Sequence, residues 1–377
     1  MKTDKYSAIL GNAVGYHDME GLTDNRPLAN LPFDGKYRLI DFQLSNLANA
    51  GIRSVYGIFR GQNIRSVFDH IRNGREWGLN TLLSHYFLGF YNTDVESQVT
   101  DRDYYEQILT YLRRAGSDQT IYMSCDILCN IDLQQVIHLH NANNRDITVV
   151  YKKLAKDQLS PANDILEIDE SDTVSGKSSQ PSDSDLEKMS TDIYVINTPF
   201  LIQKMEEEAE KAEPRKLRYL LRDLIVEYNA LAFEYTGYLA NITSVKSYYK
   251  ANMDMLDPQK FYSLLYSNQK VYTKVKNEEA TYFADSSVVK NAQLASGSVV
   301  KGEVRHSILS RNCYVGSNVK ISDSIVFPKA KIGEGAVIEY AIIDKSVSIA
   351  PGVTIRGTAE KPLVIGKNRD ILEDVEQ

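Results

Sequence analysis

The sequence predicts an α/β chain of two domains, a mainly parallel α/β domain followed by a parallel β-helix. Two observations support this prediction. Short β-branched or aromatic runs alternate with helical patterns through the first two-thirds of the chain, and an aliphatic period of six residues follows after about residue 285. Because 377 residues exceed one ordinary domain, two domains are the natural expectation.

The N-terminal two-thirds contains five runs typical of β-strands, with helical patterns between them. Strand–helix–strand spacing implies right-handed crossovers and a mainly parallel sheet, in which ligands bind outside the carboxyl ends of the strands. Segment 168–190 is rich in Ser, Asp and Gly, which predicts a loop or a polar hairpin. The strand-like runs are 6–10, 54–59, 120–125, 147–152 and 193–196, and the helical patterns are 42–50, 63–73, 103–115 and 133–142.

The C-terminal third repeats aliphatic residues at a step that fits neither a helix nor an alternating strand. Val337, Ile343, Ile349 and Ile355 are six residues apart. This period is typical of a hexapeptide β-helix, with one aliphatic residue per flat face and three faces per coil. A simple antiparallel sandwich would not explain a period of six. We therefore predict a first domain at 1–256, a linker at 257–284 and a β-helix domain at 285–377.

Composition excludes several classes of function. The net charge of −7 argues against binding to a nucleic-acid backbone. No apolar run approaches the length that spans a membrane, and "MKTDKY" lacks the apolar core of a signal peptide, so we expect no membrane association and a cytoplasmic location. Cys125, Cys129 and Cys313 have no metal-ligand spacing, and we expect them to be buried reduced thiols.

Four segments carry a resemblance to a known family. They are "GKYRLIDFQLSN" (35–46), "CDILCNIDL" (125–133), "STDIYVIN" (190–197) and "SVKSYYKANMDML" (244–256). The sequence resembles the bacterial ADP-glucose pyrophosphorylases (glucose-1-phosphate adenylyltransferases), whose patterns include G-K-[YF]-R-I-I-D-F-x-L-S-N and S-M-G-I-Y-V-F. The resemblance implies a Rossmann-like nucleotidyltransferase domain with a mostly parallel sheet and a C-terminal left-handed parallel β-helix of hexapeptide repeats.

The family joins ATP and glucose 1-phosphate into ADP-glucose and pyrophosphate, the committed step of bacterial glycogen synthesis. A sugar phosphate attacks the α-phosphorus of ATP in line, while cations stabilise the transferring and leaving phosphates. The family supplies these cations from basic residues in a glycine-rich loop, from lysines, and from Mg²⁺ held by two aspartates.

The corresponding positions in this chain have lost much of that charge. The loop "LGNAVGYHDMEGL" keeps Gly11 but has no Lys or Arg before Arg26, so the resemblance implies that Gly11 and Arg26 are remnants of a nucleotide-binding site. The first metal aspartate is retained as Asp126. Three degenerate positions follow from the same alignment: the phosphate lysine falls at Leu28, the sugar-phosphate lysine at Gln180 and the second metal aspartate at Asn241.

An aliphatic side chain cannot replace an ammonium at a polyphosphate, and an amide brings no negative charge and binds Mg²⁺ more weakly than a carboxylate does. No catalytic site is therefore intact, and the chain is most similar to the GlgD-type companion subunits of the family, which implies a regulatory, catalytically weak subunit. The expected partner is a catalytic ADP-glucose pyrophosphorylase subunit, in a hetero-oligomer such as a heterotetramer. No cofactor is required, Mg²⁺ would bind only weakly at Asp126, and a nucleotide or sugar phosphate could still bind without reacting. The activator-responsive lysine of some members falls at Asn25, which argues against that effector site.

Two alternatives remain open on the sequence. The chain could be an active sugar-phosphate nucleotidyltransferase with a rebuilt site, in which Arg26, Lys36 or Arg38 supplies charge from new positions. The β-helix could instead serve an acyltransferase, for which His306 is the candidate residue, although we expect His306 to be a surface turn residue.

Overall fold

The computed structural model describes residues 5–12, 16–60, 64–81, 85–91 and 97–377, which form two compact units interleaved in the sequence. The sheet unit combines the N-terminal strand with Phe42–Asn241 and Ser267–Tyr272. The β-helix unit combines Tyr16–Asp41, Ile242–Tyr266 and Thr273–Gln377. The two units are defined by packing and are not contiguous in the sequence. The predicted domain limits, 1–256, 257–284 and 285–377, therefore stay a prediction.

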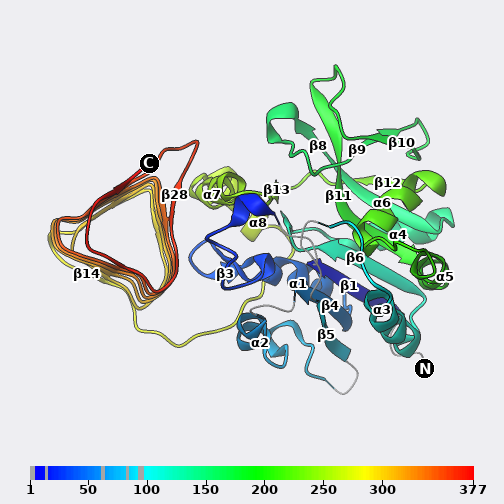
Figure 1. The fold of residues 1–377 in the computed structure, drawn as a ribbon, viewed down its shortest axis with the longest axis horizontal. Helices are drawn as coiled ribbons and strands as arrows, with labels where there is room; N and C mark the ends of the chain where they lie inside the picture. Colours follow the sequence, from blue (N-terminus) through cyan, green and yellow to red (C-terminus); the bar gives the residue numbers. More distant parts are fainter. Residues whose placement is uncertain (1–4, 13–15, 61–63, 82–84, 92–96) are drawn as a thin grey trace. The chain divides into compact units, whose positions relative to one another are not determined.

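Among the described residues, the sheet unit contains a nine-stranded sheet covered by helices (Figure 1). The strand order is β10-β9-β11-β6-β1-β4-β5, and β8 and β12 are attached through β11. The bounds are β1 (Tyr6–Asn12), β4 (Ser54–Arg60), β5 (His85–Tyr91), β6 (Gln119–Ser124), β8 (Ile147–Ala155), β9 (Ile165–Ile168), β10 (Val174–Ser178), β11 (Leu186–Asn197) and β12 (Leu231–Glu234).

The centre of this sheet is parallel, as predicted. β1 pairs in parallel with both β4 and β6, and β4 pairs in parallel with β5. β11 is antiparallel to β6 and β8 because the chain first passes through the antiparallel pair β9–β10. For segment 168–190 the polar hairpin is therefore the correct alternative. A short antiparallel pair, β7 (Ile127–Cys129) with β13 (Leu239–Asn241), follows the end of β6.

Helices cover both faces of the sheet. α3, α5 and α6 pack on the face formed by Ile9, Tyr122 and Tyr194. α4 lies on the opposite face, because its His140 contacts Thr148, and the strand neighbours of Thr148 point into the first layer. The helix bounds are α1 (Leu39–Asn49), α2 (Arg65–Ile71), α3 (Arg102–Ala115), α4 (Leu133–Asn143), α5 (Thr198–Ala209) and α6 (Leu217–Glu227).

The ends of α3 follow from its sequence. Asp101 caps the helix by accepting a hydrogen bond from the backbone N–H of Tyr104. Gly116 follows the last turn with a left-handed backbone, which a glycine adopts without strain. A capping aspartate and a terminal glycine therefore set the two ends of α3.

Most of the β-helix unit is a three-faced coil, which has a triangular section in Figure 1. Its short strands form three all-parallel sheets. The first sheet contains β14 (Tyr282–Phe283), β17 (Val299–Val300), β20 (Tyr314–Val315), β23 (Lys331–Ile332), β26 (Ser348–Ile349) and β29 (Asp370–Ile371). The second sheet contains β15 (Val288–Lys290), β18 (Glu303–Arg305), β21 (Lys320–Ser322), β24 (Val337–Glu339), β27 (Thr354–Arg356) and β30 (Val375–Glu376). The third sheet contains β16 (Gln293–Leu294), β19 (Ile308–Leu309), β22 (Ile325–Val326), β25 (Ala341–Ile343) and β28 (Leu363–Ile365).

The interior of the coil is a stack of aliphatic residues, as the repeat predicted. Ile321, Ile338 and Ile355 pair in register and are buried, 17 residues apart. Because 17 is not a multiple of six, the six-residue step cannot hold on all three faces. The structure corrects one member of the predicted set for this reason: Val337 is only half-buried, and its neighbour Ile338 takes the inward position.

Two earlier segments pack against the coil within the same unit. They contain β2 (Pro32–Phe33), β3 (Tyr37–Arg38), α7 (Val245–Met253) and α8 (Pro258–Leu265). Gly35, with φ of 65°, brings the β2–β3 turn so close to the coil that a Cβ atom would lie 3.0 Å from the carbonyl oxygen of Leu309. On α7, the hydroxyl of Tyr249 donates to the carbonyl of Asp323 at 2.7 Å.

Candidate functional site

Three of the predicted residues lie together at the carboxyl ends of the parallel strands. Gly11 lies at the end of β1, and its carbonyl accepts a hydrogen bond from Cys125, the neighbour of Asp126. Asn241 in β13 pairs with Ile127, directly after Asp126. Ligands of open α/β sheets bind at this edge, so Gly11, Asp126 and Asn241 define the candidate site. Residues 13–15 of the predicted glycine-rich loop lie outside the described residues.

Packing accounts for the glycine at position 11. A Cβ atom there would lie 2.1 Å from the hydroxyl oxygen of Tyr122 and 2.6 Å from its ring carbon. Tyr122 is itself buried in the core cluster under α3. A glycine is needed at this position for close packing, whether or not a phosphate lies beyond it.

The carboxylate of Asp126 is engaged by groups of the protein. Arg218 of α6 donates from Nη1 to its Oδ2 at 2.8 Å, and both side chains are 5% exposed. The hydroxyl of Ser124 donates to the other oxygen of Asp126. A buried guanidinium therefore contacts the one retained carboxylate of the predicted metal site.

Asp192 of β11 holds this guanidinium from its other side. Its Oδ2 lies 2.8 Å from Arg218 Nε and 2.7 Å from Arg222 Nη2, and its Oδ1 accepts from Arg222 Nε at 2.9 Å. The hydroxyl of Tyr194 also donates to Oδ1, at 2.9 Å. Asp192 is 1% exposed, and it bridges two arginines one helical turn apart on α6.

A local irregularity of β11 directs Asp192 toward α6. The ladder with β8 shifts register between Ser190 and Tyr194, and Asp192 has a positive φ of 51°. Bulges of this kind redirect a side chain out of the strand ladder. Asp192 also falls at the glycine of the family pattern S-M-G-I-Y-V-F, so the backbone conformation suits a glycine while the residue is an acid.

Electrostatics favour the ionised network. Burial opposes ionisation of Asp192, but Arg218 and Arg222 hold the pKa of this carboxyl well below its usual range. The attraction of Asp192 likewise raises the pKa of Arg222 above its ordinary value against the effect of burial. Removing one partner of such a buried pair typically costs about 3–5 kcal/mol of stability.

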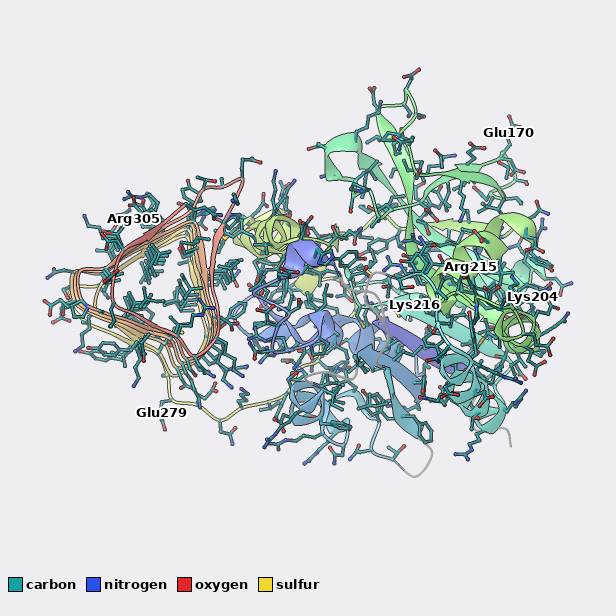
Figure 2. All side chains as sticks on the ribbon, in the orientation of Figure 1. Glu170, Lys204, Arg215, Lys216, Glu279 and Arg305 are labelled. Atoms are coloured by element: carbon teal, nitrogen blue, oxygen red, sulfur yellow. The ribbon has the colours of Figure 1, made fainter. Side chains whose placement is uncertain are left out.

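The network continues along α6 toward the start of the helix. Asp223 accepts from both Lys177, at 2.7 Å, and Arg215, and Arg215 also donates from Nε to Glu208 at 3.1 Å. Figure 2 labels Arg215 and Lys216 where α6 begins. The charges near the candidate site are therefore largely paired with one another.

The donors at this edge do not fit Mg²⁺. This hard cation prefers several oxygen ligands, mostly carboxylates and water, at 2.0–2.1 Å. Here the carboxylate of Asp126 faces a guanidinium, and Asn241 supplies an amide. Within the described part of the chain, no group of three or more His, Cys, Asp or Glu residues is arranged to hold a metal ion.

Asn241 is in an unusual state for a side chain at a sheet edge. Both its amide nitrogen and its amide oxygen are buried and have no hydrogen-bond partner among the described residues. A buried unpaired polar atom costs roughly 1–3 kcal/mol. The position is therefore not optimised for stability.

Gln180, another predicted residue, belongs to the same unit but does not lie at this edge. Gln180 lies in the exposed turn after β10, where its backbone N–H donates to Ser178. Arg26 and Leu28 belong to the β-helix unit. Within the sheet unit, the structure thus groups Gly11, Asp126 and Asn241 but not Gln180.

Arg26 has a specific partner inside its own unit. Its Nη2 donates to both carboxylate oxygens of Asp344 at 2.7 Å, and its guanidinium lies over the ring of Phe327 at 5.7 Å. Arg26 is 6% exposed and Asp344 1% exposed. Leu28 is buried in the short helical turn that follows Arg26. The ion pair between Arg26 and Asp344 therefore links segment 16–41 to the coil.

The residues proposed for a rebuilt site also lie in the β-helix unit. Arg38 donates from Nη1 to the carbonyl of Asn30 at 2.8 Å, and burial together with the nearby Arg26 lowers its pKa to about 10. Lys36 lies over the ring of Tyr37 at 5.2 Å. These contacts are within the segment that packs on the coil.

His306 is a surface turn residue, as predicted. Its φ is 41°, its side chain is 45% exposed and its Nδ1 lies 2.7 Å from Asp323 Oδ1. The three cysteines are free and buried, which confirms the prediction made for them. None of the described helices is both long and apolar enough to span a bilayer.

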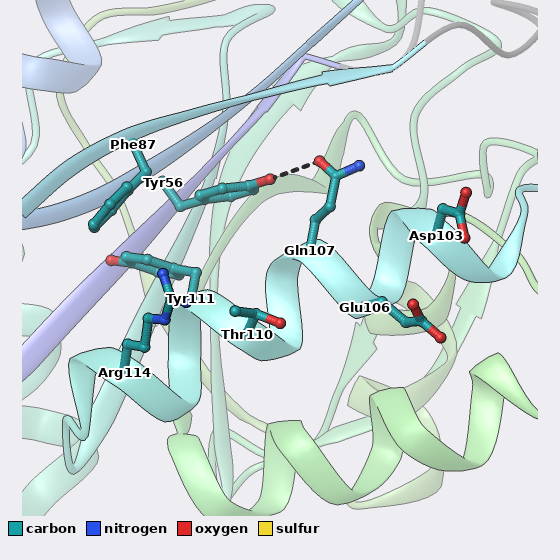
Figure 3. Close-up of a pocket in the computed structure, with 8 residues that line it drawn as sticks. All are labelled: Tyr56, Phe87, Asp103, Glu106, Gln107, Thr110, Tyr111 and Arg114. Carbon is teal, nitrogen blue, oxygen red and sulfur yellow. Dashed lines mark hydrogen bonds between the residues drawn. The ribbon is translucent and has the colours of Figure 1, made fainter.

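A separate cavity of about 450 Å³ lies beside α3. In Figure 3 the rings of Tyr56 and Tyr111 stack, with centroids 5.1 Å apart, and the hydroxyl of Tyr56 donates to Gln107 at 3.2 Å. Phe87 and Arg114 complete this wall. Tyr56 lies in the middle of β4, so the cavity is on the face of the sheet and not at the edge that carries Asp126.

Sequence reasoning missed the residues that most define the site, Asp192, Arg218 and Arg222. One signal was present, since the segment "STDIYVIN" has an aspartate where the family pattern has glycine. The arginines four residues apart in "LRYLLRDLI" gave no such signal, because arginines on an exposed helix face have the same spacing.

Comparisons with known proteins match nearly the whole chain. A family model described as "Nucleotidyl transferase" matches residues 19–258, and one described as "GlmU-like, C-terminal hexapeptide" matches residues 272–361. "Glycogen biosynthesis protein GlgD" of Bacillus subtilis (strain 168) is 32% identical over 97% of this chain and 97% of that protein. "Glucose-1-phosphate adenylyltransferase" of Bacillus mycoides (strain KBAB4) is 29% identical over 90% of this chain and 91% of that protein.

Proposed function

The chain belongs to the nucleotidyl transferase family, with the bacterial glucose-1-phosphate adenylyltransferases and GlgD as relatives, and from this premise we propose that it is a regulatory, catalytically weak or inactive subunit of glucose-1-phosphate adenylyltransferase in glycogen biosynthesis. One observation supports this most: the carboxylate of Asp126 is paired with the buried guanidinium of Arg218, and its companion position holds Asn241.

The physical argument concerns charge in the transition state. When a triphosphate splits at its α-phosphorus, negative charge grows on the transferring and leaving groups, and preorganised cations must face it. Here Arg218 faces Asp126 and Asp192 instead, and the lysine positions hold Leu28 and Gln180. Loss of one preorganised group typically lowers the rate by 10² to 10³, so the chain alone should turn over at least about 100-fold more slowly than a catalytic homologue.

The partner follows from the same proposal. A subunit that reacts poorly would act by assembling with a catalytic ADP-glucose pyrophosphorylase subunit, in a hetero-oligomer such as a heterotetramer, and by changing the kinetics of that subunit. The proposed chain requires no cofactor of its own, works in the cytoplasm, and retains at most nucleotide or sugar-phosphate binding at the edge near Gly11.

The test compares three preparations in a pyrophosphate-release assay with ATP, glucose 1-phosphate and Mg²⁺. These are the chain alone, a catalytic homologue alone, and the two co-expressed. We expect negligible release from the chain alone and a changed kcat or KM in the mixture, with co-elution of the two chains on size exclusion.

Turnover by the chain alone at the rate of the homologue would refute the proposal. It would favour the alternative, an active sugar-phosphate nucleotidyltransferase with a rebuilt site. Unchanged kinetics and separate elution of the co-expressed chains would remove the regulatory part.

A further inference from the structure

The geometry points to Arg218 as a built-in cation: we propose that its guanidinium neutralises Asp126, the retained carboxylate of the predicted metal site, in place of a divalent metal, and joins it to Asp192. One edge of the guanidinium group presents Nη1 to Asp126 at 2.8 Å, and another edge presents Nη2 to Asp192 at 2.6 Å. Arg218 thus contacts two buried carboxylates, and Arg222 supplies a second cation to Asp192.

The distances fit a guanidinium and not Mg²⁺. Oxygens that coordinate Mg²⁺ lie at 2.0–2.1 Å from a point-like ion. In this chain the oxygens of Asp126 and Asp192 are separated by the full width of a planar cation with nitrogens at two edges. A divalent ion could enter only if the guanidinium left.

Charge balance explains why the guanidinium stays. The side chains of Asp126, Arg218 and Asp192 are each at most 5% exposed, so none can be compensated by solvent. Asp192 is fixed in turn by Arg222 and by the hydroxyl of Tyr194. Buried carboxylates with this little exposure need a fixed positive partner, and Arg218 supplies it permanently.

The inference deepens the proposed function, on which its regulatory meaning rests. Because this edge of the subunit carries its own cation, neither Mg²⁺ nor a chelator changes its structure. Its paired charges preserve the shape of the edge without the metal that the reaction uses.

The experiment measures Mn²⁺ binding to the full chain, by electron paramagnetic resonance of free Mn²⁺ and by thermal shift. The variants are wild type, Arg218→Lys, Arg218→Ala and Arg218→Ala/Asn241→Asp. Arg218→Lys is the matched control, since it keeps the charge. We expect wild type and Arg218→Lys to bind no Mn²⁺ at this edge, and Arg218→Ala to gain at least tenfold in affinity, with a further gain from Asn241→Asp, which adds a carboxylate.

Two results would overturn the inference. One is stoichiometric Mn²⁺ binding by wild type that Asp126→Asn abolishes. The other is an Arg218→Ala chain that folds normally and gains no Mn²⁺ affinity. If Arg218→Ala is unfolded in a chelator, Mn²⁺ must restore its far-ultraviolet circular dichroism, and failure to do so also counts against the inference.

This readout is independent of turnover. An active wild-type chain would refute the proposed function but would leave the binding comparison unchanged. Conversely, Mn²⁺ bound by wild type at Asp126 would refute the built-in cation even if the chain proved inactive.

Discussion

Asp34 offers the sharpest test of the electrostatics of the β-helix unit. It lies in the β2–β3 turn, is 7% exposed, and its Oδ1 has no hydrogen-bond partner among the described residues. Its backbone N–H donates to Asn252 Oδ1 at 3.0 Å, which holds the turn in place. Burial raises the pKa of this carboxyl to about 8, and the attraction of Lys36 offsets only part of the effect. We expect Asp34→Asn to stabilise the unit at pH 8 and to change little at pH 4.

The sign and size follow from proton linkage. Between pH 4 and 8 the unfolded chain ionises Asp34, with a pKa of 3.8, while the folded chain keeps the proton up to about pH 8. The folded state therefore binds more protons, and wild-type stability falls by about 1.4 kcal/mol for each pH unit in this window. Over the whole window the loss is about 6 kcal/mol. Asparagine tolerates the φ of 49° and does not titrate, so the advantage of the variant grows with pH and levels off above pH 8.

Urea-dependent hydrogen exchange, read by mass spectrometry on peptides covering residues 28–41, measures this unit directly. The sole tryptophan, Trp77, belongs to the sheet unit, so its fluorescence reports the unfolding of that unit separately. Intrinsic exchange rates change with pH equally in both proteins, so the difference between them isolates Asp34. A difference between variant and wild type that is the same at pH 5 and pH 8 would refute the reasoning.

Three further predictions concern other parts of the chain. Arg26→Met should lower the stability of the β-helix unit by about 3–5 kcal/mol, because it leaves Asp344 buried without its partner. Arg26→Met/Asp344→Leu should recover most of this loss, since it removes the unpaired charge. A loss below about 1 kcal/mol for Arg26→Met in the same exchange experiment would contradict the stabilising role of the ion pair. Gly11→Ala should destabilise the sheet unit by about 1–3 kcal/mol, since its Cβ would collide with Tyr122, as measured by tryptophan fluorescence in urea; an unchanged midpoint would mean that the ring can move aside. The three buried cysteines, whose thiol pKa values burial raises, should react with Ellman's reagent only on unfolding, and rapid labelling of the native chain would contradict their burial.

The sequence was sufficient for features that depend on local pattern. The strand and helix runs of the sheet unit follow from residue periodicity, and the coil follows from a repeat that no other architecture buries as well. The family followed from contiguous motifs such as residues 35–46. Even so, the 17-residue coil, which moves Ile338 inward in place of Val337, depends on strand register and not on composition.

Only the tertiary structure decided which charges meet. Asp126 and Arg218 are 92 residues apart, and Arg26 and Asp344 are 318 apart, so no local pattern relates them. Alignment identified Asp126 as a retained acid but could not tell whether a metal or an arginine neutralises it. The bulge in β11 turns Asp192 toward α6, where Asp192 holds Arg218 beside Asp126. Arg218 therefore neutralises Asp126, because a buried carboxylate is stabilised by whichever cation the fold places within hydrogen-bonding distance.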